Sequence, residues 1–80
     1  MNQGSGKYKK GDHVKFEVED EAKHESEWLW LAVDTSDDEK EIVFGKLDSA
    51  PVVATEMYVG QDLAISYDRI RDHRRFPRPN

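Results

Sequence analysis

The chain contains no cysteine, which excludes disulfide bonds, a thiolate metal site and a cysteine nucleophile. It also contains no apolar run near the ~20 residues that a helix needs to cross a bilayer. No apolar signal-peptide core follows the first methionine. We therefore expect a soluble, cytoplasmic protein that makes no contact with a membrane.

With 80 residues, the chain has room for one small domain, near the lowest size at which a single hydrophobic core is sufficient. Its polar, Gly- and Ser-bearing start predicts a disordered leader over residues 1–7. We expect a single β domain over residues 8–73, followed by a basic, flexible tail over residues 74–80.

The net charge of −5 is distributed unevenly along the chain. Residues 1–15 carry a net charge of +3, residues 16–48 a net charge of −9 and residues 69–80 a net charge of +4. A bipolar surface of this kind steers a charged partner, although the same charges also keep a small domain soluble. The acidic centre repels phosphate, so DNA or RNA binding is disfavoured unless it uses only the basic ends.

Four segments have the pattern of short β-strands. Residues 13–19 alternate between apolar and charged side chains, and residues 63–67 alternate between large and small ones, as half-buried strands do. Residues 28–33 form the strongest apolar run, and residues 41–47 are a further apolar segment. A short 3₁₀ turn or a strand end is expected over residues 68–72.

Two of these segments carry more specific signals. Because both faces of the run at 28–33 are apolar, we expect a central strand covered on both sides, with at least one of Trp28 and Trp30 well buried. Gly45 lies inside the next strand and predicts a bulge or a bend of the sheet. Residues 52–58 fit either an extended or a short helical segment.

Together, these segments predict a mainly β fold of four to five antiparallel strands. The apolar residues need a covered face, so we expect a small, strongly bent sheet or a half-open SH3-like barrel. The opening Gly11-Asp12-x-Val14 is common where a loop enters the first strand of such barrels. Because a meander leaves edge strands, we expect a monomer or an edge-strand dimer.

The order of short blocks between Tyr8 and His73 resembles the bacterial YegJ-like domain-of-unknown-function family (number 2314). The blocks are YKKGDHVKF at 8–16, EWLWLAV at 27–33, GKLDSAP at 45–51 and GQDLAI at 60–65, followed by IRD at 70–72. His73 stands where the family commonly has Trp. The resemblance implies a fold but no activity.

The sequence lacks the motifs of catalysis, phosphate binding and metal binding. His13, His24 and His73 do not have the close spacing of a typical metal site. The acids between 34 and 39 lack the alternating ligands, the central Gly and the final Glu of a Ca²⁺-binding loop. No serine has a nucleophile-elbow context. We therefore predict a protein without enzyme activity, metal or cofactor.

Glu27 and Trp30 allow two interpretations. In the first, an acid beside an exposed aromatic ring forms a recognition pocket for a cation or a peptide. In the second, Trp30 belongs to the core, and a nearby carboxylate or carbonyl accepts a hydrogen bond from its indole N–H.

The leading hypothesis is a non-enzymatic binding module that contacts a protein partner through an acidic surface. Trp28, Trp30 or Tyr58 would supply an aromatic anchor. Acidic side chains speed association with a basic surface more than they increase the affinity. The predicted partner-binding residues are Glu17, Glu19, Glu27, Trp30, Asp37, Asp38 and Tyr58.

Two other hypotheses stay open. An acidic chain of this size, encoded by a phage or a mobile element, would imitate nucleic acid and inhibit a nucleic-acid-handling protein. Alternatively, the Arg-rich C-terminal segment would bind nucleic acid, since arginines interleaved with an aromatic residue suit that ligand. The residues predicted for this role are Arg71, Arg74 and Arg75. In a purely structural interpretation, the same arginines pair with the acidic body of the protein.

Overall fold

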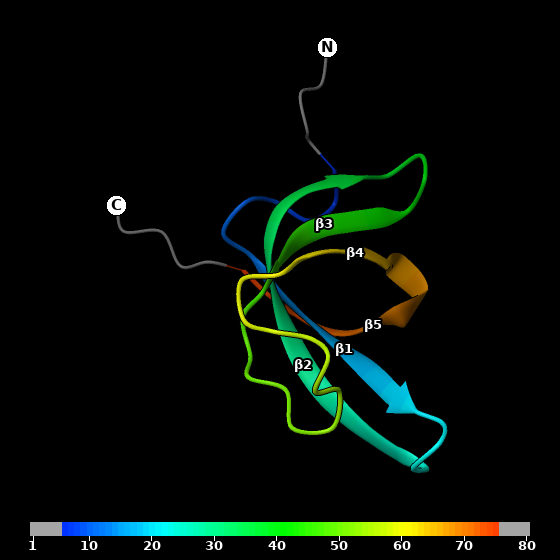
Figure 1. The fold of residues 1–80 in the computed structure, drawn as a ribbon. Coiled ribbons are helices and arrows are strands. Elements are labelled where there is room, and N and C mark those ends of the chain that lie inside the picture. The colour runs from blue at the N-terminus through cyan, green and yellow to red at the C-terminus, as the bar shows by residue number, and fades with distance from the viewer. Residues whose placement is uncertain (1–5, 76–80) are drawn as a thin grey trace.

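The computed structural model describes residues 6–75. Five antiparallel strands form one sheet in the order β4-β3-β2-β1-β5 (Figure 1). A single 3₁₀ turn, η1 (Tyr67–Arg69), separates the last two strands. The strands are β1 (His13–Asp20), β2 (Glu25–Asp37), β3 (Ile42–Leu47), β4 (Asp62–Ser66) and β5 (Ile70–Arg74).

The prediction of a mainly β fold with four to five antiparallel strands is confirmed. The sheet is strongly bent and unclosed, with β4 and β5 at its two edges. Among residues 6–75 no α-helix occurs, and η1 with β5 accounts for the segment expected to be a 3₁₀ turn or a strand end. Residues 1–5 and 76–80, which include most of the predicted leader and tail, lie outside the described residues.

The ladder of the sheet is irregular at two places, between Lys15 and Phe16 where β1 pairs with β5, and in β2, the longest strand. Its first part pairs with β1 and its second part with β3, and the register shifts between Val33 and Thr35. Gly45 faces this irregularity from β3, where an added Cβ would lie 2.2 Å from the carbonyl oxygen of Ala32. The bulge predicted at Gly45 is therefore found in the neighbouring strand, and glycine permits the close approach of the two backbones.

The core lies on the inner side of the bend. Alternate residues of the strands point inward, as the period-two patterns predict, and Tyr8 adds a ring from the segment before β1. Val18, Met57, Leu63, Tyr67 and Ile70 pack around the buried cluster. Its fully buried large side chains are Val14, Phe16, Leu29, Leu31, Val43 and Leu47.

The expectation that β2 is covered on both sides is wrong. Leu29 is 2% exposed, but Trp28 is 50% exposed, and Trp30 is only half-buried. An antiparallel sheet can leave one of its faces in water, and within residues 6–75 no element covers the outer face of β2. The two indoles therefore belong to the surface rather than to the core.

A long segment, residues 48–61, covers one end of the core without regular secondary structure. We call it the covering loop; in Figure 1 it runs beside β2, in green to yellow. Ala54 is buried in it, and Met57 packs against the core cluster. Neither the extended nor the helical segment expected over residues 52–58 is found.

Candidate functional site: an exposed indole face beside an acidic hairpin tip

Two tryptophans and two cations share the outer face of β1, β2 and β5. Lys15 lies opposite Trp30 in the register of β1 and β2, and His13 lies opposite Arg74 in the register of β1 and β5. Since alternate residues of a strand share a face, Trp28 lies on this face as well. We call the surface formed by Lys15, Trp28, Trp30 and Arg74 the indole face.

The cations of the indole face lie against the aromatic rings. Lys15 Nζ is 5.5 Å from the centre of the Trp28 ring and 5.6 Å from that of Trp30. The guanidinium of Arg74 is 5.3 Å from the Trp30 ring. Within the described part of the chain neither cation forms an ion pair, and the carboxylate of Asp72, opposite Lys15, accepts a hydrogen bond from the His73 amide. Their positive charges are therefore available to a partner.

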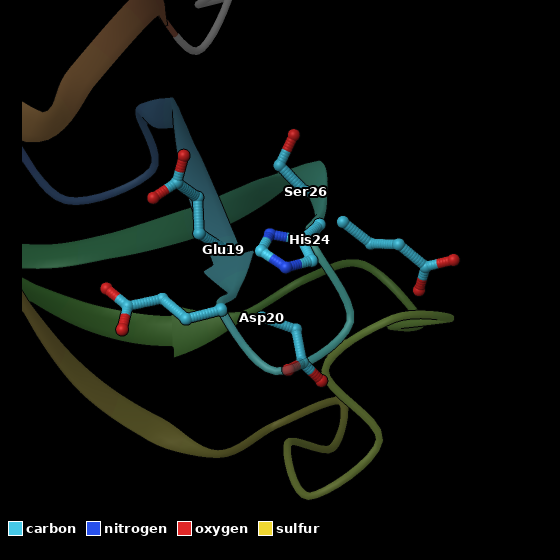
Figure 2. Close-up of a pocket in the computed structure, with 6 residues that line it drawn as sticks. Glu19, Asp20, His24 and Ser26 are labelled. Atoms are coloured by element: carbon cyan, nitrogen blue, oxygen red, sulfur yellow. The ribbon is translucent and has the colours of Figure 1, made fainter.

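Acidic side chains gather where the β1–β2 hairpin turns. Figure 2 shows Glu19, Asp20 and Ser26 arranged around the His24 ring at this end of the hairpin. Asp20 accepts hydrogen bonds from the amides of Ala22 and Lys23 and so shapes the turn. We call this region the hairpin tip; its open pocket is lined by Glu19, Asp20, Glu21, His24, Glu25 and Ser26.

Glu17 links the hairpin tip to the indole face. It lies opposite Trp28 on β1, and Glu19 follows on the same face. Arg69 approaches from the β5 side and donates a hydrogen bond to the backbone carbonyl of Glu17 at 3.0 Å. One surface therefore runs from cations at Lys15, across the indoles, to acids at the tip.

The side chain of Glu27 points to the face of β2 opposite the indole face. Its role differs from both roles that the sequence suggested. Its carboxylate accepts hydrogen bonds from three successive backbone amides of the covering loop, at 3.0 and 3.2 Å from Val52, 2.7 Å from Val53 and 2.8 Å from Ala54. These amides, first that of Ala54 and then that of Val52, lower the pKa of Glu27 against an opposing effect of burial. The residue therefore anchors a loop and does not accept a hydrogen bond from an indole.

Asp37 and Asp38 lie at the other end of β2, away from the indole face. The carboxylate of Asp37 accepts hydrogen bonds from the backbone amides of Glu39 and Lys40 in the turn that follows. Asp38 accepts a hydrogen bond from the Tyr67 hydroxyl at 2.6 Å, which together with the Lys7 amide lowers the pKa of Asp38. Burial, and then the hydrogen bond to Asp38, raise the pKa of Tyr67. Asp37 therefore shapes its own turn, whereas Asp38 ties this turn to Lys7 and Tyr67.

Tyr58 projects from the covering loop and is 63% exposed. Its amide donates a hydrogen bond to the side chain of Gln61 at 3.1 Å, within a tight turn that contains Gly60 at φ 90°. Two further apolar side chains of the loop, Val52 and Val59, are more than half exposed. The predicted aromatic anchors thus lie on two surfaces, the indole face and the covering loop.

The covering loop begins directly beside the indole face. The backbone amide of Trp30 donates a hydrogen bond to Ser49 Oγ at 2.9 Å, and the amide of Asp48 donates one to the Trp30 carbonyl at 2.8 Å. The Asp48 carboxylate pairs with His13 Nε2 at 3.0 Å. These contacts fix the first two residues of the loop against the strands that carry the indole face.

The predicted basic residues are not equivalent. Arg74 is the last residue of β5 and contacts Trp30, so it is part of the sheet although the predicted tail begins with it. Arg71 donates a hydrogen bond to the carbonyl of Asp68 at 2.8 Å, whereas Arg75 is exposed. Only Arg74 joins the indole face.

One polar pair was not anticipated from the sequence. His73 Nε2 lies 2.8 Å from the Asp12 carboxylate, which is largely buried and also accepts a hydrogen bond from the Lys9 amide. The His73 ring packs edge-on against Tyr8, with 4.7 Å between the ring centres. The pair ties β5 to the turn before β1. The only signal in the sequence was the Gly11-Asp12 turn, which predicts nothing about His73.

Comparisons with protein-family models, with curated proteins and with solved structures find no match for this chain. The resemblance to the YegJ-like family stays a prediction. Among residues 6–75, no group of His, Asp and Glu is placed to hold a metal ion, and no helix is long and apolar enough to cross a membrane.

Proposed function

We propose that the protein is a non-enzymatic binding module whose partner is another protein, bound by the indole face and the hairpin tip together. The observation that carries this proposal is the half exposure of Trp28, a large apolar side chain that lies in β2 directly before the buried Leu29. Exposed aromatic side chains that are held by a rigid sheet are typical centres of protein–protein contacts.

The fold that we propose for the module is an SH3-like half-open barrel. The strand order β4-β3-β2-β1-β5 and the short 3₁₀ turn between the two edge strands support it. Barrels of this kind carry many unrelated functions, so the function has to be argued from the surface and not from the fold.

The charge of the surface favours a protein over a nucleic acid. Lys15 and Arg74 lie at one end of the surface, and Glu17 and Glu19 continue it to the hairpin tip. A partner that fits both ends has acidic and basic groups, as a protein surface has. A nucleic acid has only negative charge and would be repelled by the acids next to Trp28.

A second candidate, a nucleic-acid binder, is supported by the contact of Arg74 with the Trp30 ring. In proteins that bind single-stranded nucleic acid, a base stacks on an aromatic ring and an arginine binds the neighbouring phosphate. The third candidate, an acidic imitation of nucleic acid, would use the acids at both ends of β2 and would compete with nucleic acid for a basic target.

Affinity capture with matched variants tests the proposal. The protein is immobilised and exposed to a nuclease-treated lysate of the cells that produce it, alongside Trp28→Ala, the double variant Glu19→Gln/Glu25→Gln and the control Phe44→Ala. Phe44 is an exposed aromatic residue on β3, outside the indole face. We expect one or more proteins to be retained by the wild type and the control and to be lost from the other two variants.

Equal retention by all four proteins would contradict the proposal. The capture is repeated with an untreated lysate, and proteins retained from the untreated lysate but not from the nuclease-treated one would favour the nucleic-acid binder. Displacement of the captured protein by added DNA, with loss at high salt, would favour the acidic imitation of nucleic acid.

A further inference from the structure

We propose that the cationic end of the indole face binds a carboxylate of the partner, supplied by an aspartate or glutamate that stands next to an apolar residue. The site is the open pocket lined by His13, Lys15, Trp30 and Arg74, which we call the cation pocket. This inference rests on the proposed function, which supplies the partner. It names the chemical group that the partner presents and the side chains that receive it.

Three neighbouring strands build the cation pocket, so the sheet fixes its shape. Lys15 of β1 lies opposite Trp30 of β2, and His13 of β1 lies opposite Arg74 of β5. Residues directly opposite each other in an antiparallel pair have their side chains close together on one face. The volume of the pocket, about 450 Å³, is within the range of pockets that hold small ligands.

The two permanent cations of the pocket are not engaged by other polar groups of the described chain. Among residues 6–75, neither Lys15 nor Arg74 forms a side-chain hydrogen bond or an ion pair. Lys15 Nζ lies over both indoles, and the guanidinium of Arg74 lies over the Trp30 ring. An indole ring is not a conventional hydrogen-bond acceptor, so the N–H donors of both cations remain for an anion.

Acids around the cation pocket limit how much negative charge it accepts. Asp48 pairs with His13 at 3.0 Å, Asp72 lies opposite Lys15, and Glu17 follows on the same face of β1. These acids would repel the closely spaced charges of a nucleic acid, whereas a single carboxylate is balanced by the two cations. A carboxylate also matches the planar fork of an arginine, with which it forms two parallel hydrogen bonds.

Trp28 determines what accompanies the carboxylate. Its side chain is 50% exposed, and Lys15 Nζ is 5.5 Å from the centre of its ring and 5.6 Å from that of Trp30. A carboxylate that binds Lys15 therefore brings the residue beside it close to the exposed indole. Covering this ring with an apolar side chain removes apolar surface from water and stabilises the contact.

A peptide titration tests the cation pocket without knowledge of the partner. The chain has two tryptophans, and both belong to the indole face, so the indole N–H signals in proton–nitrogen correlation spectra report only on this surface. The probe is a capped peptide in which glutamates flank a phenylalanine, added to the isotope-labelled, full-length protein at low salt. We expect the Trp30 signal to shift and saturate. The net charge of −5 works against non-specific attraction of an acidic peptide.

Matched arginine variants locate the binding. Arg74→Gln removes a charge from the cation pocket, and Arg75→Gln removes the same charge from the next residue, outside the pocket. We expect Arg74→Gln to weaken the affinity for the peptide about fivefold, as the loss of one solvent-exposed ion pair does, and Arg75→Gln to leave it unchanged. Arg74→Lys should restore part of the affinity. Both arginines are exposed, so these replacements remove no packing from the core.

Three results would overturn the carboxylate site. The first is a Trp30 signal that does not respond to the peptide, or responds equally when glutamine replaces its glutamates. The second is equal weakening by Arg74→Gln and Arg75→Gln, which would indicate general charge attraction. The third is tighter binding of oligodeoxythymidylate than of the peptide, which would favour the nucleic-acid binder.

The failure of this inference is distinguishable from the failure of the proposed function. In the affinity capture, a protein that is lost from Trp28→Ala but retained equally by Arg74→Gln and Arg75→Gln would overturn the carboxylate site and leave the proposed function intact. Equal retention by the wild type and Trp28→Ala would contradict the proposed function. A peptide titration that depends on Arg74 would still support the cation pocket as a carboxylate site.

Discussion

The two faces of β2 are made of similar side chains and have opposite surroundings. Leu29 and Leu31 are at most 2% exposed, whereas Trp28, between Glu27 and Leu29 in the same strand, is 50% exposed. The apolar run of β2 therefore contains two sets of residues with different roles. The inner set stabilises the fold, and the outer set is available for contacts with other molecules.

The two faces of β2 contribute differently to the free energy of folding. Burying a leucine side chain contributes about 1.5–3 kcal/mol to folding, whereas an indole that remains half in water contributes much less than its size suggests. Truncation on the inner face should therefore change stability, and truncation on the outer face should change binding.

The largest effect is expected on the inner face. Leu31 is fully buried, and we expect Leu31→Ala to lower the free energy of unfolding by about 2–5 kcal/mol, because it removes apolar contacts and leaves a cavity. Urea denaturation followed by circular dichroism measures this change. A loss below about 0.5 kcal/mol would show that the inner face is not the packed side of the strand.

A smaller loss is expected where β2 and β3 approach most closely. In Gly45→Ala the new Cβ would lie 2.2 Å from the carbonyl oxygen of Ala32, so the two backbones have to separate. We expect the free energy of unfolding to fall by about 1–3 kcal/mol, the usual range for overpacking. Urea denaturation measures the loss. A urea midpoint equal to that of the wild type would contradict this account of the close approach of β2 and β3.

Asp38 and Tyr67, which share a hydrogen bond, should make stability depend on pH at both extremes. The folded-state pKa of Asp38 is lowered, so its stabilisation is present above the ordinary carboxyl pKa near 3.9 and is lost as the pH falls. The folded-state pKa of Tyr67 is raised, so its stabilisation is present below about pH 10 and is lost as the pH rises further.

The variant Tyr67→Phe separates these contributions. Its unfolding free energy, measured from pH 2 to 11, should show a smaller alkaline decrease and a smaller acidic decrease than the wild type. The alkaline decrease that remains includes the contribution of Lys46, whose pKa is raised by its hydrogen bond to Asp62. The loss of unfolding free energy that remains at low pH includes the contribution of Glu27, whose pKa is also lowered in the folded state. An unchanged alkaline decrease would contradict the assignment to Tyr67.

The smallest effect on stability is expected on the outer face. In Trp28→Ala the unfolding free energy should change by no more than about 1 kcal/mol, although the side chain removed is larger than that of Leu31. The same variant should lose the captured partner. A stability loss comparable to that of Leu31→Ala would remove the distinction between the two faces.

The sequence predicted the strands better than it predicted their surroundings. Alternation along residues 13–19 depends only on neighbouring side chains, and β1 (His13–Asp20) agrees with it. The apolar run at 28–33 was a strand as expected, but its coverage depends on which elements pack against each face. No local pattern contains that information.

The candidate site was predicted only in part for the same reason. Glu19 and Trp30 do lie on one surface, while Asp37 and Asp38 lie at the far end of β2. The amides that bind Glu27 are 25 to 27 residues away along the chain, and Asp12 and His73 are 61 residues apart. Such contacts are made by the folded topology, and a single sequence shows only residue types and spacing.

The way in which Glu27 holds the covering loop has a consequence for protein engineering. The carboxylate contacts main-chain amides, and every amino acid except proline supplies one. The backbone conformation at residues 52–54 is therefore held without any contact between Glu27 and the side chains of these residues. A combinatorial library that randomises the exposed positions 52, 58 and 59, without proline at 52 or at 58, whose amide donates to Gln61, would display new recognition surfaces on this scaffold.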